Sequence, residues 1–230
     1  MRRLENLRIR SQPTDFTCGP TCLHAVYSYY GDHVDLQRVI NEIPTLPEGG
    51  TLAVRLANHA LARGYHCTLC TYNLQIFDPT WFKKPSIDII ECLKLQQKAK
   101  SDAKLRLATP SYLEFLERGG QLKYHELNRQ LIHNYLKQEI PVLTGLSATY
   151  LYGCARETND YDDISGEPTG HFVILSGYDS KARKIFITDP QKDNPRFGET
   201  EYAVSFERLI GAILLGIITY DANLLIIEPR

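Results

Sequence analysis

The stretch Gln12–Leu23, QPTDFTCGPTCL, decides how this chain is interpreted. Its first half, QPTD, is rich in residues that favour turns. Its second half begins an apolar helix. Thr17 is a candidate N-cap, Pro20 lies in the first turn, where a missing N–H costs nothing, and Gly31 follows the end. We therefore expect a helix over residues 18–30, entered through a turn.

Cys18 stands at the start of this expected helix. The positive end of the helix dipole and the free N–H groups of the first turn favour a thiolate at that position. The thiolate is the nucleophilic form of cysteine, but a catalytic cysteine also needs a base, usually histidine, and a group that orients the base. Cys18 is therefore a candidate nucleophile that requires partners from elsewhere in the chain.

A hairpin near the end of the chain offers such partners. The strand HFVILSGYD begins with His171, the turn falls at residues 180–183, and the return strand is KIFITDP. Folding the hairpin about residue 181 places His171 opposite residue 191, within two positions, so that Asp189 is expected close to His171. A carboxylate there can accept a hydrogen bond from the imidazole and fix its tautomer.

An acyl-transfer site also needs donors for an oxyanion. Gln12 lies six residues before Cys18, on the segment that leads into the helix. At this spacing its side-chain amide can fold back beside the thiolate. We expect the Gln12 amide and the backbone N–H of Cys18 to serve as the two donors.

Taken together, these residues resemble a known family. The pattern of Gln12, five residues, then Cys-Gly-Pro and an apolar helix resembles the opening of the bacteriocin-processing C39 peptidases and their C39-like relatives, a branch of the papain-like cysteine peptidases. The later blocks GHFVILSGYD and ITDP resemble the His and Asp motifs of that family. The resemblance implies that Cys18 is the nucleophile, His171 the general base, Asp189 its orienting group and Gln12 the oxyanion-hole residue.

The resemblance covers mainly residues 11–64 and 140–190, and the chain departs from the family in two ways. Peptidases that trim double-glycine leader peptides are typically fused to a membrane transporter, and no such part is seen in this sequence. The separation between Cys18 and His171 is also long for a minimal C39 domain. The resemblance therefore implies thiol hydrolase chemistry more strongly than it implies a leader peptide as substrate.

Composition restricts the other function classes. The chain has 230 residues, enough for one domain, which we place at residues 1–230. A net charge of −1 argues against a nucleic-acid binder, and no run of about 18 apolar residues predicts a membrane span. The first residues lack a secretory signal, so we expect a cytoplasmic protein with six reduced thiols, although export by a signal-less route stays open.

The order of elements predicts an α+β domain with a papain-like fold, in which the helix of Cys18 packs on a mainly antiparallel sheet. Short helices are expected at 35–42 and 52–63 and a strand near 65–72. From Ile140 the pattern turns to strands. Those expected strands are IPVLTGL, HFVILSGY, KIFITDP, LLGIITY and NLLIIEP.

Two segments between these elements stand apart. Residues 83–136 are expected to be a mostly helical insertion, with helices after Ser86, Ser111 and Asn128, and residues 147–170 a polar loop. Because the acidic part of that loop, 156–167, leads straight to His171, it is expected to favour basic over acidic substrates if it borders the cleft. Comparing the hydrolysis of basic and neutral peptides tests this.

The remaining cysteines are expected to be structural. Cys22 lies one helical turn after Cys18 and is interpreted as a core residue, with a resolving thiol as the alternative. Cys67 and Cys70 form a lone C-x-x-C pair without the second pair that a zinc site needs. Cys92 and Cys154 have no visible partner. No metal or other cofactor is therefore expected.

The sequence thus predicts a cysteine peptidase, or a closely related amide hydrolase, that acts on a peptide or protein and has no nucleic-acid or membrane partner. Two alternatives stay open. The same residues could serve an acyl transferase of the transglutaminase or transpeptidase kind, in which an amine replaces water as acceptor. The fold could also serve as a non-catalytic peptide-binding module. Oligomeric state and cleavage specificity stay open.

Overall fold

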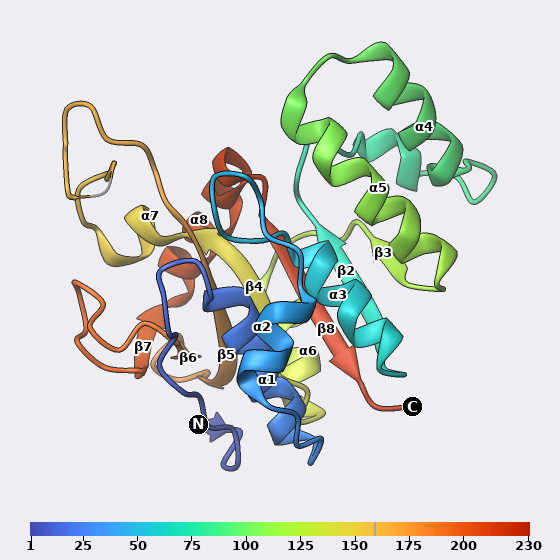
Figure 1. Cartoon of the computed structure of the whole chain (residues 1–230). Coiled ribbons are helices and arrows are strands. Elements are labelled where there is room, and N and C mark those ends of the chain that lie inside the picture. Colours follow the sequence, from blue (N-terminus) through green and yellow to red (C-terminus); the bar gives the residue numbers. More distant parts are fainter. Residues whose placement is uncertain (159) are drawn as a thin grey trace.

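A computed structural model describes residues 1–158 and 160–230, and their strands form one sheet (Figure 1). The strand order is β3-β2-β8-β4-β5-β6-β7, with β1 paired to β5 beside this path. Only the pair β2–β3 is parallel. The strands are β1 (Arg2–Arg3), β2 (His66–Thr71), β3 (Gln121–Lys123), β4 (Val142–Ser147), β5 (Gly170–Asp179), β6 (Lys184–Thr188), β7 (Glu201–Ser205) and β8 (Asn223–Glu228).

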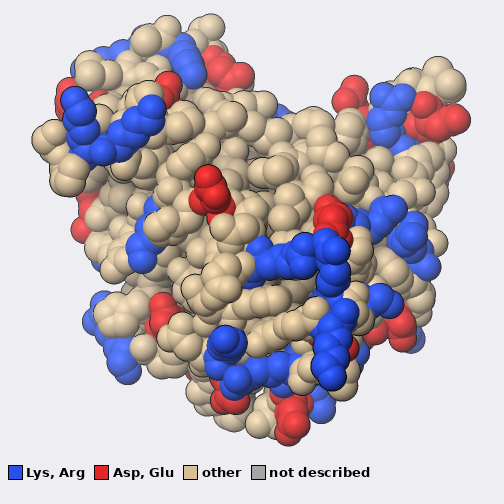
Figure 2. Space-filling model, turned by 180° about the vertical axis from the view of Figure 1, so that it is seen from behind, with Lys and Arg blue, Asp and Glu red and all other residues tan. Residues whose placement is uncertain are grey.

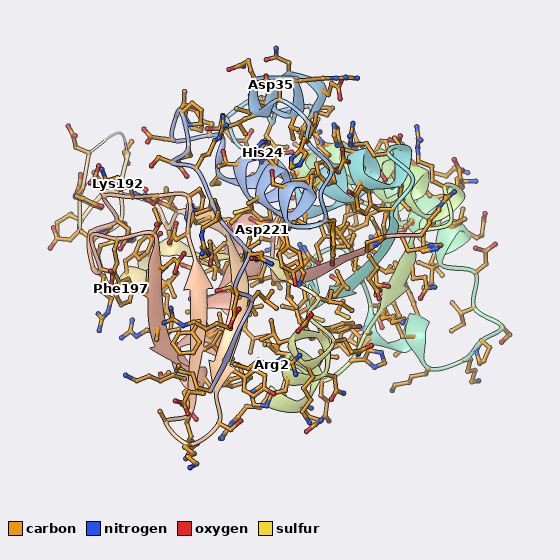
Figure 3. All side chains as sticks on the ribbon, turned by 90° about the horizontal axis from the view of Figure 1, so that it is seen from below. Arg2, His24, Asp35, Lys192, Phe197 and Asp221 are labelled. Atoms are coloured by element: carbon orange, nitrogen blue, oxygen red, sulfur yellow. The ribbon has the colours of Figure 1, made fainter. Side chains whose placement is uncertain are left out.

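Helices cover both faces of this sheet. Helices α1 and α3 pack against one face, and α6 lies on the opposite side (Figures 1 and 3). The α-helices are α1 (Cys18–Tyr29), α2 (Leu36–Glu42), α3 (Ala53–Ala62), α4 (Ile89–Ala99), α5 (Ala103–Glu117), α6 (Arg129–Lys137), α7 (Ala148–Tyr152) and α8 (Phe206–Leu215); the 3₁₀ helices are η1 (Pro79–Phe82) and η2 (Gly216–Thr219). The mixed α+β class and the mainly antiparallel sheet expected from the sequence are confirmed.

Strand β5 runs through the middle of the core. It pairs with β4 on one side and β6 on the other, and its residues from His171 to Tyr178 are buried. A strand buried on both faces needs a nearly continuous apolar sequence, and HFVILSGY has one. His171 is the polar exception, at the end where the strand begins. A polar side chain held in such a place by a rigid strand has a fixed position for chemistry.

The apolar run LLGIITY is helical, which corrects the strand expected there. Its residues form the end of α8 and then η2, and the strand of this region is NLLIIEP, which forms β8. A short apolar run has the composition of a buried strand or a buried helix, and its periodicity does not separate the two. The local signal for a helix is Ser205, because its side chain accepts a hydrogen bond from the N–H of Arg208 and so caps the start of α8.

Two other expected boundaries were wrong, and one expected helix cap is absent. Helix α5 begins at Ala103, where Asp102 accepts the N–H of Leu105, and not after Ser111. The polar loop after β4 begins with the short helix α7. Thr17 precedes α1 but does not cap it, because its hydroxyl donates to the carbonyl of Thr14. The other strands missed from the sequence, β1, β3 and β7, are only two to five residues long.

Helices α4 and α5 form a lobe at one end of the sheet (Figure 1). Basic side chains mark the surface of this lobe, at the upper left of Figure 2. Helix α6 is different, because it packs against β4 and β5, and its His133 stacks on Tyr178 at 4.0 Å between ring centroids. Residues 83–136 are thus mostly helical, as expected, but α6 belongs to the packed body; the insertion itself stays a prediction.

Among the helices of residues 1–158 and 160–230, none is both long enough and apolar enough to cross a membrane.

Candidate active site

The site lies where β5 and β6 part. The ladder between these strands ends at the pair Ile174–Thr188. Continuing that register places His171 opposite residue 191, as the hairpin geometry predicts. His171 Nε2 lies 2.8 Å from Oδ1 of Asp189, and both side chains are buried. The proximity expected for this pair is therefore present.

Three further groups hold the Asp189 carboxylate. The hydroxyls of Tyr152 and Tyr202 donate to Oδ2 at 2.8 and 2.5 Å, and the backbone N–H of Gln191 donates to Oδ1 at 2.9 Å. A buried carboxylate that accepts hydrogen bonds at both oxygens is fixed in position and stabilised as an anion. The sequence interpretation missed both tyrosines, because they come from α7 and β7, two short elements that it did not predict.

Tyr202 is itself held by an aromatic contact. The ring of Phe197 lies nearly parallel to the ring of Tyr202, with centroids 3.8 Å apart and planes at 10°. Figure 3 shows Phe197 on the loop beside the outer strands of the sheet. This stacking restricts the tyrosine ring, so the hydroxyl that reaches Asp189 has a defined direction. The loop between β6 and β7 therefore supports the site from outside.

Charges within the pair determine its protonation. Burial by itself lowers the pKa of His171, but the charge and hydrogen bond of Asp189, with Cys18 beside the ring, raise it to about 10. Burial by itself raises the pKa of Asp189, but the charge and hydrogen bond of His171 and the Tyr202 hydroxyl leave it lowered. We therefore expect an ion pair, with the ring protonated at neutral pH.

Cys18 is the first residue of α1 and is 7% exposed. Because Thr17 turns its hydroxyl back to Thr14, no side chain caps the helix. The N–H groups of Cys18 and Gly19 then stay free for a ligand, since the first N–H groups of a helix have no partner within it. Because Nε2 of His171 is hydrogen-bonded to Asp189, Nδ1 is the ring nitrogen that remains available on the side of Cys18.

Gln12 is anchored next to the acid of the pair. Its backbone N–H donates to the carbonyl of Pro190 at 2.9 Å, one residue after Asp189. Its side-chain Oε1 is buried, and none of the described residues forms a hydrogen bond to it. The segment before α1 is thus tied to the end of the hairpin, which places all four predicted residues in one region of the molecule.

The pKa values of several other thiols are raised. All six cysteines are free, and Cys22, Cys67 and Cys70 are buried. Burial raises the pKa of Cys67 to about 12 and that of Cys70 to about 11. Burial also raises the pKa of the partly exposed Cys154. These groups are protonated at neutral pH and are poor nucleophiles.

The acidic loop before β5 is organised by its own side chains. Asp162 accepts hydrogen bonds from the hydroxyl and backbone N–H of Ser165 and from the N–H of Ile164, and these contacts lower the pKa of Asp162 to about 2. Arg156 donates to the carbonyls of Asp163 and Ile164. Part of this segment's charge is therefore used to shape the loop, and its effect on substrate choice stays a prediction.

Comparison with known proteins supplies a family context. Residues 119–210 match the family described as the Peptidase_C39 like family. This match includes His171 and Asp189, but it begins at residue 119 and so does not include the segment with Gln12 and Cys18. No curated protein matches the sequence. The family match therefore covers the segment that contains His171 and Asp189.

Solved structures resemble the whole fold. A protein described as a C39-like peptidase from Bacillus anthracis has a TM-score of 0.56 and 16% identity, over 100% of this chain and 98% of that one. A double-glycine-motif protease from an AMS/PCAT transporter, solved with its leader peptide, has a TM-score of 0.48 and 15% identity, over 100% and 95%. The peptidase domain of Streptococcus ComA, a bifunctional ABC transporter of a quorum-sensing pathway, has a TM-score of 0.46 and 12% identity, over 97% and 99%.

Proposed function

We propose that this chain is a cysteine peptidase that hydrolyses peptide bonds through Cys18, His171 and Asp189. Residues 119–210 match the C39-like family, and the fold is similar to that of a C39-like peptidase, which supports the proposal. One observation carries the proposal. An uncapped helix begins with Cys18, and beside it lies a histidine whose other ring nitrogen is 2.8 Å from a buried carboxylate. A nucleophile, a base and an orienting group are the parts that covalent acyl transfer needs.

The proposed reaction begins with the Cys18 thiolate, which a protonated His171 stabilises by its charge. The sulfur attacks the carbonyl carbon of the substrate, and the oxygen becomes an oxyanion near the N–H of Cys18 and the amide of Gln12. The imidazolium of His171 then gives its proton to the leaving amine, so that the C–N bond breaks and an acyl-enzyme forms. Neutral His171 next takes a proton from water, which attacks the thioester and releases the acid.

Selective labelling of Cys18 tests the proposed chemistry without a known substrate. We expect iodoacetamide near pH 7 to modify Cys18 first, because its neighbours favour the thiolate although it is only 7% exposed. Cys92 is the comparison, since it is more exposed than Cys18 and, as the fourth residue of α4, follows a helix start that the side chain of Asp88 caps. Mass spectrometry of tryptic peptides measures both rates. Faster labelling of Cys92 than of Cys18 contradicts the proposal.

Gln12 is expected to act on the oxyanion. Replacing Gln12 with alanine removes the amide donor but keeps the backbone bond to Pro190, so the segment should stay in place. We expect kcat to fall by about 10²–10³-fold with KM changed little, the cost found for a lost oxyanion donor. Steady-state kinetics on a cleaved peptide measures this. The labelling rate of Cys18 serves as the control, because alkylation forms no oxyanion; an unchanged kcat rules out this role.

A further inference from the structure

Cys22 lies directly beneath the proposed catalytic groups. It is one helical turn after Cys18 on α1 and is fully buried. Its Sγ donates to the carbonyl oxygen of Phe172 at 3.2 Å. Phe172 follows His171 in β5, and Cys22 lies one turn after Cys18 in α1. This contact therefore joins the helix of the proposed nucleophile to the strand of the proposed base.

The start of β5 is paired on one edge alone. Its ladder with β4 includes His171 and Phe172, but its ladder with β6 begins at Ile174. Helix α1 packs against β5. A Cβ on Gly19 would lie 3.2 Å from the ring of Phe172, and Cys22 holds the same residue through its backbone. Helix α1 therefore approaches Phe172 closely at Gly19, and Cys22 adds a polar contact to the same residue.

The charge state of Cys22 fits the role of a donor. Burial raises the pKa of its thiol well above the ordinary value, and the negative charges of Cys18 and Asp189 act in the same direction. The thiol thus keeps its proton at any pH at which the catalytic groups are charged. It does not compete with Cys18 as a nucleophile, and its S–H stays available to the carbonyl of Phe172.

We propose that Cys22 is a positioning residue for the reaction, because its thiol fixes the start of β5 against α1 and so sets the separation of the Cys18 sulfur and the His171 ring. The inference rests on the proposed function of those two residues. It predicts that loss of the thiol acts mainly on kcat and on the reactivity of Cys18, since a misplacement of about 1 Å between reacting groups costs about 10²-fold in rate.

A purely structural role of Cys22 has a matched control in the same chain. Cys67 is also a buried thiol on a core element, β2, and its sulfur lies 3.6 Å from the carbonyl of Ala57 on α3. Its contact joins a strand to a helix in the same manner but away from the site. Replacing either cysteine by alanine removes the same atom from the core, so a difference in catalysis isolates the position of Cys22.

The experiment compares Cys22→Ala, Cys22→Ser and Cys67→Ala with the unchanged chain. For each, the pH dependence of Cys18 alkylation, kcat, KM and Tm are measured. We expect Cys22→Ala to lower kcat about 10²-fold with KM within about twofold, and to lower Cys18 alkylation at pH 7. Cys22→Ser, which retains a donor, should recover a large part of both. Cys67→Ala should lower Tm alone.

The outcomes separate this inference from the proposed function. If Cys18 is activated in the unchanged chain, and Cys22→Ala and Cys67→Ala lower Tm alike while kcat and the alkylation profile stay as they were, the positioning role is wrong and the proposed function stands. If Cys18 of the unchanged chain reacts like an ordinary thiol, both are wrong. Should Cys22→Ala fail to fold, Cys22→Ser still decides, because a positioned hydroxyl predicts activity well above that of Cys18→Ala.

Discussion

Replacing Cys18 with alanine should reduce kcat on the order of 10⁶-fold, since removing the nucleophile of such a triad costs about that much. The residual rate would come from binding and oxyanion contacts alone. The measurement is the release of new peptide ends from a proteome-derived peptide mixture, followed by mass spectrometry. Because the mixture offers many sequences at once, the assay works before any substrate is identified, and it reveals the cleavage sites of the unchanged chain at the same time.

The fold should survive this change. Cys18 is small and stands at the first position of α1, where alanine is a good helix residue, so the loss of stability should be about 1 kcal/mol. Tm and circular dichroism check this. Cys92→Ala is the control for loss of a thiol that lies away from His171. Turnover that persists in Cys18→Ala would remove Cys18 from the mechanism, whereas an unchanged chain that releases no peptide ends and has an inert Cys18 would leave a peptide-binding module as the better interpretation.

Local signals in the sequence were sufficient for the pairing of His171 with Asp189. A hairpin has a fixed register once its turn is placed, and the alternation of its strands fixes which residues share an end. The pair Ile174–Thr188 continues to His171 opposite residue 191, the position expected from the turn alone. A bulge between Leu175 and Gly177 lies between the turn and His171 and moves the register by one residue, which stays within the two positions that the expectation allows.

Contacts between distant elements could not be predicted in this way. Tyr152 precedes Asp189 by 37 residues and is part of a five-residue helix, and Tyr202 follows it by 13 on an edge strand. Neither belongs to a pattern that marks a carboxylate ligand. Their hydroxyls reach Asp189 because α7 and β7 pack beside the hairpin, which depends on the whole sheet. The same limit applies to Cys18 and His171, which are 153 positions apart in the sequence.

The uncapped start of α1 shows how a wrong local expectation can indicate function. The sequence predicts that Thr17 caps the helix, because threonine before an apolar run is a common N-cap. Thr17 instead closes a turn with Thr14, and the N–H groups of the first turn are left for another acceptor. Such an arrangement leaves part of the helix end unsatisfied, and it persists where a ligand or a developing charge uses it.

Replacing Asp189 with asparagine should lower kcat/KM about 10²-fold and move the alkaline limb of the pH profile downwards. The limb is expected near pH 10, because the charge of Asp189 outweighs the burial that by itself lowers the pKa of His171. Without that charge, burial is opposed by Cys18 beside the ring but no longer by a carboxylate, and the protonated ring is lost at a pH about 1–3 units lower. In Asp189→Asn the amide N–H₂ also points at groups that donate hydrogen bonds to the carboxylate in the unchanged chain. His171 and residue 189 therefore lose their geometry as well as the negative charge.

The control for this variant is a second buried carboxyl, Asp221, which lies in the middle of the molecule in Figure 3 and is 4% exposed. Asp221→Asn removes a buried carboxyl without touching the hydrogen bond to His171, so its alkaline limb should stay near pH 10. The pH dependence of kcat/KM between about pH 6 and 11 measures the limb in both variants, because turnover needs the protonated ring as general acid. A limb that moves equally in both, or in neither, means that Asp189 does not hold the charge of His171. A limb that moves only in Asp189→Asn means that this carboxylate keeps His171 protonated through the neutral range.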